Sequence, residues 1–411
     1  MMSDFNINNN LKKLFIRPAT GHFYCIDGLR AISILWLIGF HCLFFMIVFG
    51  PERYVDISHQ MAGVFVKLGF YGVDIFFVIS GFIISFSLMK EWQQHGSINI
   101  RKFYYRRILR LLPAYYTSMA VLVLYTTVNV DNIWANIIYV NNFITMNGQF
   151  MPWTWSLAVE EQFYIIFPFF LLFFLKFDRF RAALLSLLAV LAVYIRFCVA
   201  GHDGMSLSLQ ELNVDASMLS TPHFAAYFDM LYDKIYTRFG ALLAGVIVAY
   251  IYLFTNVKAD MEKGPLKYVL LAVSFILLVG LISVQVMASG SAFNAPELRV
   301  IIAIFPYVFS VSIAYILFFT LSGSGESSLL GRFLSLRIWY PISQVSYSAF
   351  LVNPMVIMLS YKAVLNHLPV PATSSVVINA LLLTMLSLFI AGLLYLAIER
   401  PMMNMRHRYK A

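Results

Sequence analysis

Long apolar stretches alternate with short polar segments along the whole chain. Each stretch is about 20 residues long, which is the length that an α-helix needs to cross the hydrocarbon core of a bilayer. The pattern therefore predicts an all-α, polytopic membrane protein with about ten transmembrane helices. The expected spans are residues 31–50, 69–89, 111–130, 153–175, 182–200, 235–254, 267–287, 299–320, 341–361 and 375–398.

The composition supports this class. Hydrophobic residues make up 61% of the chain and charged residues only 12%, which excludes an ordinary soluble domain. The three cysteines, Cys25, Cys42 and Cys198, have no metal-ligand spacing and form no even disulfide framework. Cys42 follows His41 directly, and adjacent helix positions point about 100° apart, so the two cannot pair within one helix. We therefore expect no metal site and no reactive cysteine.

Basic residues gather in alternate loops. Most of the 29 lysines and arginines precede the first expected span or follow the second, fourth, sixth, eighth and tenth. The longest loop on the other side, about 201–234, is acidic and long enough for a short helix or a substrate contact. The positive-inside rule then places both termini in the cytoplasm, with 1–26 as an N-terminal segment and 399–411 as a tail. The net charge of +9 reflects this asymmetry, so we expect no nucleic-acid partner.

No internal repeat or linker divides the chain. We therefore expect residues 1–411 to form a single membrane domain, without a soluble catalytic domain.

The first span has an arginine at its N-terminal end and a histidine near its middle. Arg30 and His41 are about three helical turns apart, so both project from nearly the same face, roughly 16 Å apart along the axis. We expect Arg30 at the cytoplasmic membrane surface and His41 near the bilayer centre. An ionisable group at that depth is costly and is a functional candidate. The structural alternative is a neutral imidazole that hydrogen bonds to a neighbouring helix.

Polar residues also interrupt the second span. Asp74 lies near its outer end, and Ser80 and Gly81 lie about halfway along it. Each also has a structural interpretation: an ion-pair partner for Asp74, a bond to its own helix backbone for Ser80, and a close helix contact for Gly81. For Asp74 the functional and structural interpretations are equally favoured.

An arginine cluster precedes the third span. Arg106, Arg107 and Arg110 lie within one helical turn of each other and have no acidic neighbour in the sequence. Guanidinium groups bind phosphates and carboxylates bidentately, which lysine cannot do. The cluster favours a specific phosphate ligand, and the structural alternative is contact with lipid headgroups.

The fourth span opens with aromatic and acidic residues. Glu160 and Glu161 fall about two turns into the helix, and Tyr164 lies one turn beyond Glu160 on the same face. Two adjacent carboxylates inside a span favour a polar cavity for one and an ion pair or helix end for the other. Trp153 and Trp155 lie at interface depth, where an aromatic belt and sugar stacking are the two interpretations.

These depths separate the candidates at the cytoplasmic surface from those that lie at mid-membrane and further out. The arginines lie at the cytoplasmic surface, His41 and Ser80 lie at mid-membrane, and Glu160, Glu161 and Asp74 lie outward of them. A phosphate-bearing donor inside, a base at the centre and an outward polar vestibule indicate group transfer across the bilayer. The alternative is a transporter or flippase of a lipid-linked anionic sugar, which predicts inverted repeats that the sequence does not show.

The chain resembles the acyltransferase 3 family of integral membrane acyltransferases over nearly its whole length. The matching motifs are Arg30 with His41, the GVDIFFVISGF block at 72–82, Arg106, Arg107 and Arg110 with Pro113, the WSLAVEEQFY block at 155–164, and the ending Glu399, Arg400 and Pro401. One stretch departs from the family pattern, because Phe350 and Asn353 stand where members often carry a tyrosine and a histidine.

The resemblance implies a multi-pass O-acetyltransferase of a bacterial inner membrane that acts on a cell-surface glycan. Acetyl-CoA would be a co-substrate, and no cofactor would be permanently bound. The other partners would be membrane lipid and the glycan or lipid-linked saccharide acceptor. O-antigen lipopolysaccharide and exopolysaccharide are the expected acceptors, and peptidoglycan is less favoured without the soluble domain that some relatives append.

The resemblance also implies roles for the candidate residues. His41 would act as general base towards a sugar hydroxyl, or would itself carry the acetyl group. Glu160 or Glu161 would orient its imidazole, and Ser80, Arg30 or a backbone amide would stabilise the oxyanion. The expected donor-binding residues are Arg106, Arg107, Arg110, Ser80 and Gly81, and the expected acceptor or supporting residues are Asp74, Tyr164, Trp153, Trp155 and Arg238.

Overall fold

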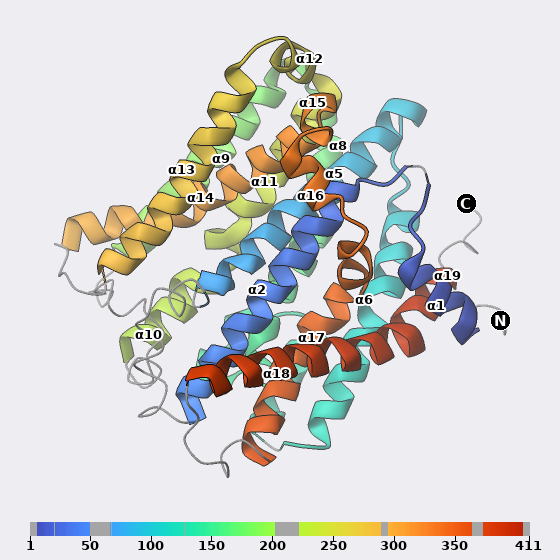
Figure 1. The fold of residues 1–411 in the computed structure, drawn as a ribbon. Coiled ribbons are helices and arrows are strands. Elements are labelled where there is room, and N and C mark those ends of the chain that lie inside the picture. The colour runs from blue at the N-terminus through green and yellow to red at the C-terminus, as the bar shows by residue number, and fades with distance from the viewer. Residues whose placement is uncertain are drawn as a thin grey trace.

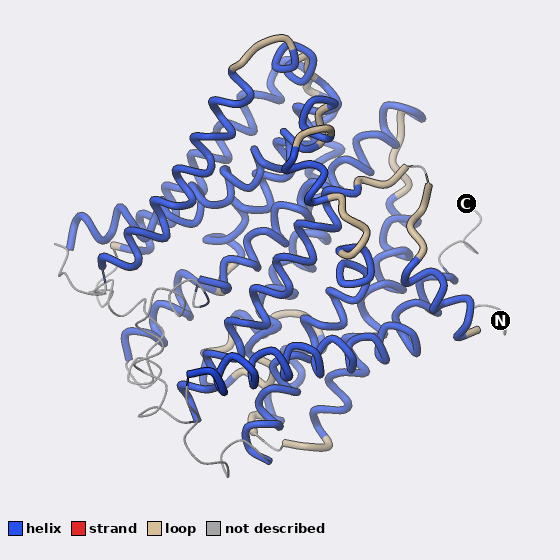
Figure 2. The backbone as a smooth tube through the Cα atoms, in the orientation of Figure 1, coloured by secondary structure: helices blue, strands red, loops and turns tan. Residues whose placement is uncertain are grey.

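The computed structural model describes residues 6–19, 21–49, 66, 68–126, 128–201, 222–288, 295–363 and 373–405. These residues form helices and connecting loops and contain no strand. The helices pack into one bundle (Figure 1 and Figure 2). The all-α class is therefore confirmed.

The long helices are α2 (Tyr24–Phe49), α5 (Gly72–His95), α6 (Ile100–Val123), α8 (Trp155–Lys176), α9 (Arg181–Ala200), α11 (Ile235–Phe254), α13 (Leu266–Ala288), α14 (Ala295–Thr320), α17 (Trp339–Ala363) and α18 (Thr373–Leu394). The short helices are α1 (Ile7–Phe15), α7 (Ile133–Ile137), α10 (Pro222–Tyr227), α12 (Val257–Glu262), α15 (Gly323–Glu326), α16 (Leu329–Leu334) and α19 (Arg400–Met405). Two π-helical turns, Phe228–Tyr232 and Tyr395–Glu399, follow α10 and α18. The short helix α10 lies in the long loop as expected, and residues 202–221 of that loop lie outside the described residues.

Eight helices in the described part of the chain are long and apolar enough to span a membrane. They match all the expected spans except the third and the seventh. The third corresponds to α6, which carries the arginine cluster, and the described apolar part of α13 covers only Leu266–Leu281. The chain is therefore a multi-pass membrane protein by helix length and composition, while the number ten and the cytoplasmic termini stay predictions.

α6 begins well before the expected span 111–130. It runs over Ile100–Val123, and the side-chain oxygen of its N-cap, Asn99, accepts a hydrogen bond of 2.9 Å from the backbone N–H of Lys102. This cap satisfies a free N–H of the first turn and fixes the start of the helix. The arginine cluster therefore lies on the helix, as expected, although it precedes the predicted span.

α2, α5, α11 and α17 form the centre of the bundle, where α5 packs along α11 and α2 along α17. Two glycines permit the first contact. A Cβ atom at Gly81 would lie 2.0 Å from the carbonyl oxygen of Leu242, and one at Gly245 would lie 2.0 Å from that of Val78. Backbones at this separation leave no room for a side chain. Gly81 therefore makes the close helix contact, and its expected place in a donor site is not supported.

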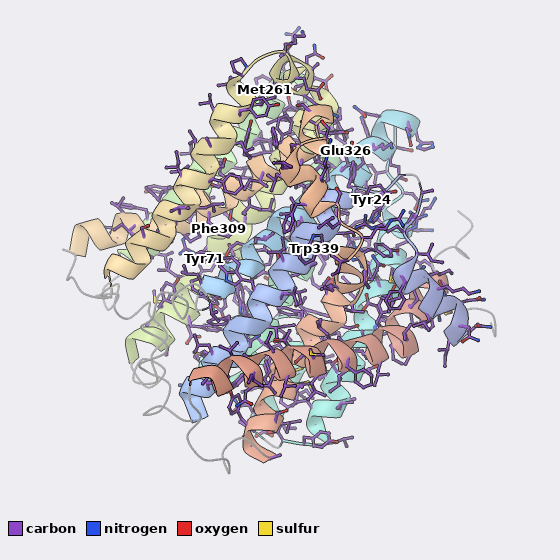
Figure 3. The ribbon with its side chains drawn as sticks, viewed as in Figure 1. Tyr24, Tyr71, Met261, Phe309, Glu326 and Trp339 are labelled. Atoms are coloured by element: carbon purple, nitrogen blue, oxygen red, sulfur yellow. The ribbon has the colours of Figure 1, made fainter. Side chains whose placement is uncertain are left out.

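The other helices surround this centre. α9 and α14 pack against α11, and α13 packs against α14. α18 packs against α17 on the opposite side (Figure 1). Aromatic side chains fill the spaces between helices, for example Tyr71 and Phe309, whose rings stack at 4.7 Å between centroids (Figure 3). α1 and α19 meet near the two chain ends, where Lys13 Nζ donates to Asn404 Oδ1 at 3.0 Å.

Candidate active site

A groove with mostly basic walls runs between α5 and α6. Its charged and ionisable lining residues are Lys90, Glu91, His95, Lys102, Arg106, Arg107 and Arg110. Ile83, Arg107 and Arg110 also line a cavity deeper in the bundle, so the groove and this cavity adjoin. Arg106 is exposed and contributes to the groove alone, so the structure divides the expected cluster.

The deeper cavity, called here the arginine cavity, is lined by Arg30, Arg107, Arg110 and Glu160 among its charged residues. Within the described residues, none of the three arginines makes an ion pair or a hydrogen bond. The buried Nε atom of Arg110 has no partner there either. Three guanidinium groups facing one carboxylate leave an excess of positive charge. A cavity of this kind favours an anionic ligand.

Helix starts explain why these arginines lie so deep. α2 begins at Tyr24 and not at residue 31, which places Arg30 about two turns inside the helix. Arg107 and Arg110 lie about two to three turns inside α6. They therefore reach Glu160, which enters from the opposite end of the bundle on α8. The expected separation of Arg30, Arg107 and Arg110 from Glu160 is therefore wrong.

One wall of the arginine cavity carries a series of hydrogen bonds. Tyr164 Oη donates to Glu160 Oε2 at 3.0 Å, which confirms that the two share a helix face. Ser80 Oγ lies 2.6 Å from Tyr164 Oη. Because the single hydroxyl proton of tyrosine is directed at Glu160, the Ser80 hydroxyl is the donor in this second bond. The guanidinium carbon of Arg107 lies 4.7 Å from the centre of the Tyr164 ring.

His41 lines a second cavity, called here the His41 cavity. Its walls are aromatic and aliphatic, with Leu37, Phe40, Phe44, Phe45, Phe70, Val73, Met146, Pro152, Trp153, Trp155, Tyr227, Phe228, Tyr232, Phe350 and Pro354. No Lys, Arg, Asp or Glu belongs to this lining within the part of the chain that the structure describes. Val73 and Phe350 line both cavities, so their side chains lie between His41 and the arginines.

The imidazole of His41 has a partner that differs from the expected one. Its Nδ1 atom lies 2.6 Å from Oδ1 of Asn353 on α17. Glu160 is bonded to Tyr164 in the arginine cavity, and Glu161 lines neither cavity. The prediction that a glutamate orients His41 is therefore wrong. The reason is helix packing, since α2 lies along α17 and receives its polar partner from that helix.

Asp74 is a buried ion-pair partner. Arg238 Nη2 donates to Asp74 Oδ2 at 3.2 Å, and both side chains are 2% exposed. The structural interpretation of Asp74 is therefore confirmed. The guanidinium carbon of Arg238 lies 5.1 Å from the Trp155 ring centroid and 4.9 Å from that of Tyr232. The pair thus supports the aromatic wall of the His41 cavity from behind.

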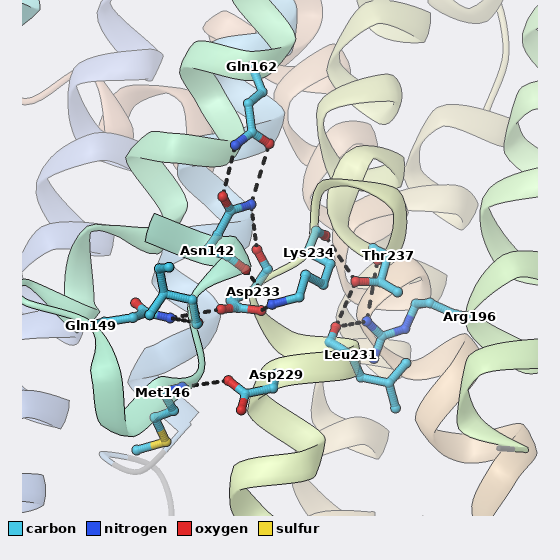
Figure 4. A network of polar contacts seen from close by, with 11 residues as sticks. Asn142, Met146, Gln149, Gln162, Arg196, Asp229, Leu231, Asp233, Lys234 and Thr237 are labelled. Atoms are coloured by element: carbon cyan, nitrogen blue, oxygen red, sulfur yellow. Dashed lines mark hydrogen bonds and ion pairs between the residues drawn. The ribbon is translucent and has the colours of Figure 1, made fainter. Parts of the chain in front are cut away.

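A polar network ties the loop that leads to Trp153 to the segment before α11 (Figure 4). Asp233 Oδ1 accepts from Lys234 Nζ at 2.7 Å, and Asp233 Oδ2 accepts from Gln149 Nε2 at 3.1 Å. Asp229 Oδ1 accepts from the backbone N–H of Met146 at 2.7 Å. Burial raises the pKa of Asp233 to about 7. The network fixes one side of the His41 cavity, to which Met146 belongs.

Sequence reasoning gave no role to three residues of this region. Asn353 contacts His41, and Phe350 lies between the cavities. Glu399 is buried in a π-helical turn, where its Oε2 accepts from Ser348 Oγ at 2.6 Å. The available signal was polarity, because Asn353 is an amide in the middle of an apolar span. No group of His, Cys, Asp and Glu residues that could hold a metal ion occurs within the described ranges.

Comparison with known proteins places the chain in a family. The sequence model of the acyltransferase 3 family, described as an acyltransferase domain, matches residues 23–396. Peptidoglycan O-acetyltransferase OatA from Listeria monocytogenes is 36% identical over 170 residues, which cover 37% of this chain and 24% of that protein. O-acetyltransferase OatA from Staphylococcus aureus is 27% identical over 395 residues, which cover 92% of this chain and 56% of that protein.

The aligned residues thus span only part of the length of these relatives, and where nearly the whole chain aligns it covers about half of the relative. No solved structure matches the chain. The family match spans nearly the whole sequence and includes every helix that lines the two cavities. The chain therefore belongs to the acyltransferase 3 family of membrane acyltransferases.

Proposed function

We propose that this protein is a membrane O-acetyltransferase of a bacterial inner membrane. It moves the acetyl group of cytoplasmic acetyl-CoA to a hydroxyl of a cell-envelope glycan on the outer side. One observation carries the proposal: the basic groove, the arginine cavity and the His41 cavity adjoin one another through shared lining residues. Such a series supports a route along which a thioester on a long, flexible arm reaches an imidazole.

The donor would enter from the groove between α5 and α6. Coenzyme A is anionic at its nucleotide end and neutral along its pantetheine arm. The basic groove suits the phosphates, and the guanidinium groups of Arg107 and Arg110, which have no ion-pair partner among the described residues, offer bidentate contacts. The neutral arm would then extend past these arginines towards Phe350.

The acceptor would enter the His41 cavity. Its described lining is aromatic and uncharged, which suits the apolar face of a neutral sugar stacked on Trp153 or Trp155. A carboxylate or phosphate would lose its hydration there without a compensating charge. The reacting sugar unit is therefore uncharged, and any charged part of the acceptor stays outside the cavity. The Listeria relative is named for peptidoglycan, so peptidoglycan precursors belong among the test acceptors.

His41 is the general base in this reaction. Its imidazole takes the proton from the sugar hydroxyl while the oxygen attacks the thioester carbonyl carbon. The tetrahedral intermediate collapses as the carbon–sulfur bond breaks, and the imidazolium returns the proton to the leaving thiolate. The products are the O-acetyl sugar and coenzyme A. The oxyanion is stabilised by the positive charge of the adjoining arginine cavity.

The test uses purified protein in lipid nanodiscs with acetyl-labelled acetyl-CoA and a panel of acceptors. The panel contains neutral oligosaccharides, their uronic-acid counterparts and a peptidoglycan precursor. We expect O-acetyl ester formation on an uncharged sugar and coenzyme A release, both lost in His41→Ala. Absence of transfer to every acceptor, together with movement of a labelled lipid-linked sugar across proteoliposome membranes, would replace this proposal with transport.

A further inference from the structure

The side-chain amide of Asn353 is held in one orientation by its own helix. Nδ2 donates to the carbonyl oxygens of Ala349 at 2.7 Å and of Phe350 at 3.1 Å. Pro354 explains the second bond. In a regular helix the N–H of residue 354 would donate to the Phe350 carbonyl, and proline has no N–H. A carbonyl inside an apolar span needs another donor, and the asparagine supplies it.

This orientation determines which atom of Asn353 faces His41. Rotating the amide by half a turn would direct Oδ1 at two carbonyl oxygens, with three acceptors and no proton between them. Nδ2 therefore faces the carbonyls and Oδ1 faces the imidazole. Oδ1 is only an acceptor, so Nδ1 of His41, at 2.6 Å, carries the proton of this bond.

The assignment leaves the other ring nitrogen free. A neutral imidazole has one N–H, so when Nδ1 is protonated, Nε2 holds a lone pair. Nε2 has no hydrogen-bond partner within the described residues. His41 lines the aromatic cavity, where an acceptor hydroxyl would meet this atom.

We infer that Asn353 is a positioning residue that holds His41 as the Nδ1–H tautomer and so presents Nε2 as the base. The tautomer follows from the geometry alone, and its catalytic use rests on the proposed function. A neutral amide fixes the tautomer without adding a negative charge behind the ring. The imidazolium is therefore less stabilised than beside a carboxylate, which favours return of its proton to the leaving thiolate.

Nitrogen NMR tests the tautomer without any activity assay. The full-length protein is labelled with ¹⁵N-histidine in nanodiscs, and His41→Gln identifies the signals of His41 among the eight histidines. At neutral pH we expect a protonated Nδ1 and an unprotonated Nε2, and Asn353→Leu should convert part or all of the signal to the Nε2–H form. A protonated Nε2 in the wild type, or a pattern unchanged in Asn353→Leu, would overturn the inference even if acetyl transfer is established.

Kinetics test the consequence for the reaction. Asn353→Leu should lower kcat at least about a hundredfold, as removal of a histidine-orienting group does elsewhere, while donor Kd stays unchanged. Asn353→Asp keeps an oxygen that accepts from Nδ1 of His41 and loses the two bonds to the carbonyls of Ala349 and Phe350, whereas Asn353→Leu loses all three. It should therefore retain more activity than Asn353→Leu, and its negative charge should move the acid limb of the pH–rate profile to higher pH. Ile357→Val, one turn along α17, controls for repacking. The inference fails if Asn353→Leu keeps the wild-type kcat, or if Asn353→Asp is no more active than Asn353→Leu. If Asn353→Leu does not fold, the pH–rate profile of Asn353→Asp decides, and an acid limb at the wild-type position would overturn the inference.

Discussion

Arg107 of α6 lies on the ring of Tyr164 of α8, with its guanidinium carbon 4.7 Å from the ring centroid. The aromatic ring holds the guanidinium by its face and leaves its N–H edges without a partner in the described structure. Tyr164 in turn donates to Glu160. The arginine is thus positioned without being neutralised, at the point where the groove meets the arginine cavity. This combination suits the binding of an anion.

The first prediction concerns the two arginines shared by the groove and the arginine cavity. If Arg107 and Arg110 bind phosphate oxygens bidentately, lysine keeps the charge and loses the second hydrogen bond. We expect Arg107→Lys and Arg110→Lys to weaken acetyl-CoA binding by roughly 1–3 kcal/mol each, measured by calorimetry on purified protein. Arg179→Lys, an exposed residue outside the groove, is the matched control. If both variants bind acetyl-CoA with wild-type affinity, the arginines contact lipid headgroups and not the donor.

The second prediction concerns the base. His41→Ala should insert, fold and bind acetyl-CoA normally, and should lose acetyl transfer to below about a hundredth of the wild-type rate. Cys42→Ala is the control, because Cys42 is the next residue on α2 and contacts Ala380 of α18 instead of the cavity. Substantial transfer by well-folded His41→Ala would remove the imidazole from the reaction.

The third prediction separates the adjacent carboxylates. Glu160 accepts the Tyr164 hydroxyl and supplies the only negative charge in the described lining of the arginine cavity, whereas Glu161 lines neither cavity. We expect Glu160→Gln to lower turnover roughly tenfold to a hundredfold, because glutamine can still accept from Tyr164 but lacks the negative charge that strengthens this bond. Glu161→Gln should stay within about threefold of the wild type in the same assay. Equal effects of both variants would contradict the division that the structure makes.

Apolar periodicity and charge were enough to predict the helical class and most of the long helices. The expected spans 182–200 and 235–254 agree closely with α9 and α11, because charged or polar residues bound both helices at each end. α6 was misplaced because its first half is basic, and hydropathy cannot recognise a helix whose charged face lines a cavity. The Asn99 cap was the local signal that marked its true start.

The sequence named the charged residues that line the arginine cavity, but it did not predict which side chains pair with each other. Spacing along one helix placed Tyr164 beside Glu160, since both lie on α8. The partner of His41 comes from α17, far away in the sequence, and depends on which helices pack together. The depth of a residue along its span does not indicate which helix packs beside it. Asn353 therefore stood in the sequence as a departure from the family pattern, and only the packing of α2 on α17 gives it a partner.

The fourth prediction concerns the aromatic wall of the His41 cavity. Trp153 lines this cavity, and an indole ring can stack on the apolar face of a sugar. We expect Trp153→Ala to raise the acceptor KM about tenfold while the donor Kd is unchanged. Trp134→Ala, at an exposed position outside the cavity, should change neither the acceptor KM nor the donor Kd. A changed donor Kd with a constant acceptor KM would assign the cavity to the donor.

The last prediction concerns the pH dependence of stability. Burial raises the pKa of Asp233 from its ordinary value of 3.8 to about 7, although Lys234 Nζ at 2.7 Å opposes the shift. Between about pH 4 and pH 7 the folded protein therefore holds a proton that the unfolded chain has lost. Asp233 therefore adds to the free energy of unfolding at low pH. This contribution falls as pH rises and is lost above about pH 7.

Asp233→Asn removes this titration, so melting curves of both proteins between pH 5 and pH 8 measure it. We expect the melting temperature of the wild type to fall relative to that of Asp233→Asn as pH rises, and the difference to level off above about pH 7. Asp229, whose pKa burial also raises, is present in both proteins, so the difference contains its titration only through its interaction with Asp233. Asp260→Asn, at an exposed position, is the control and should run parallel to the wild type. A constant difference between wild type and Asp233→Asn would mean that Asp233 stays ionised throughout this range, and that its bond to Lys234 outweighs its burial.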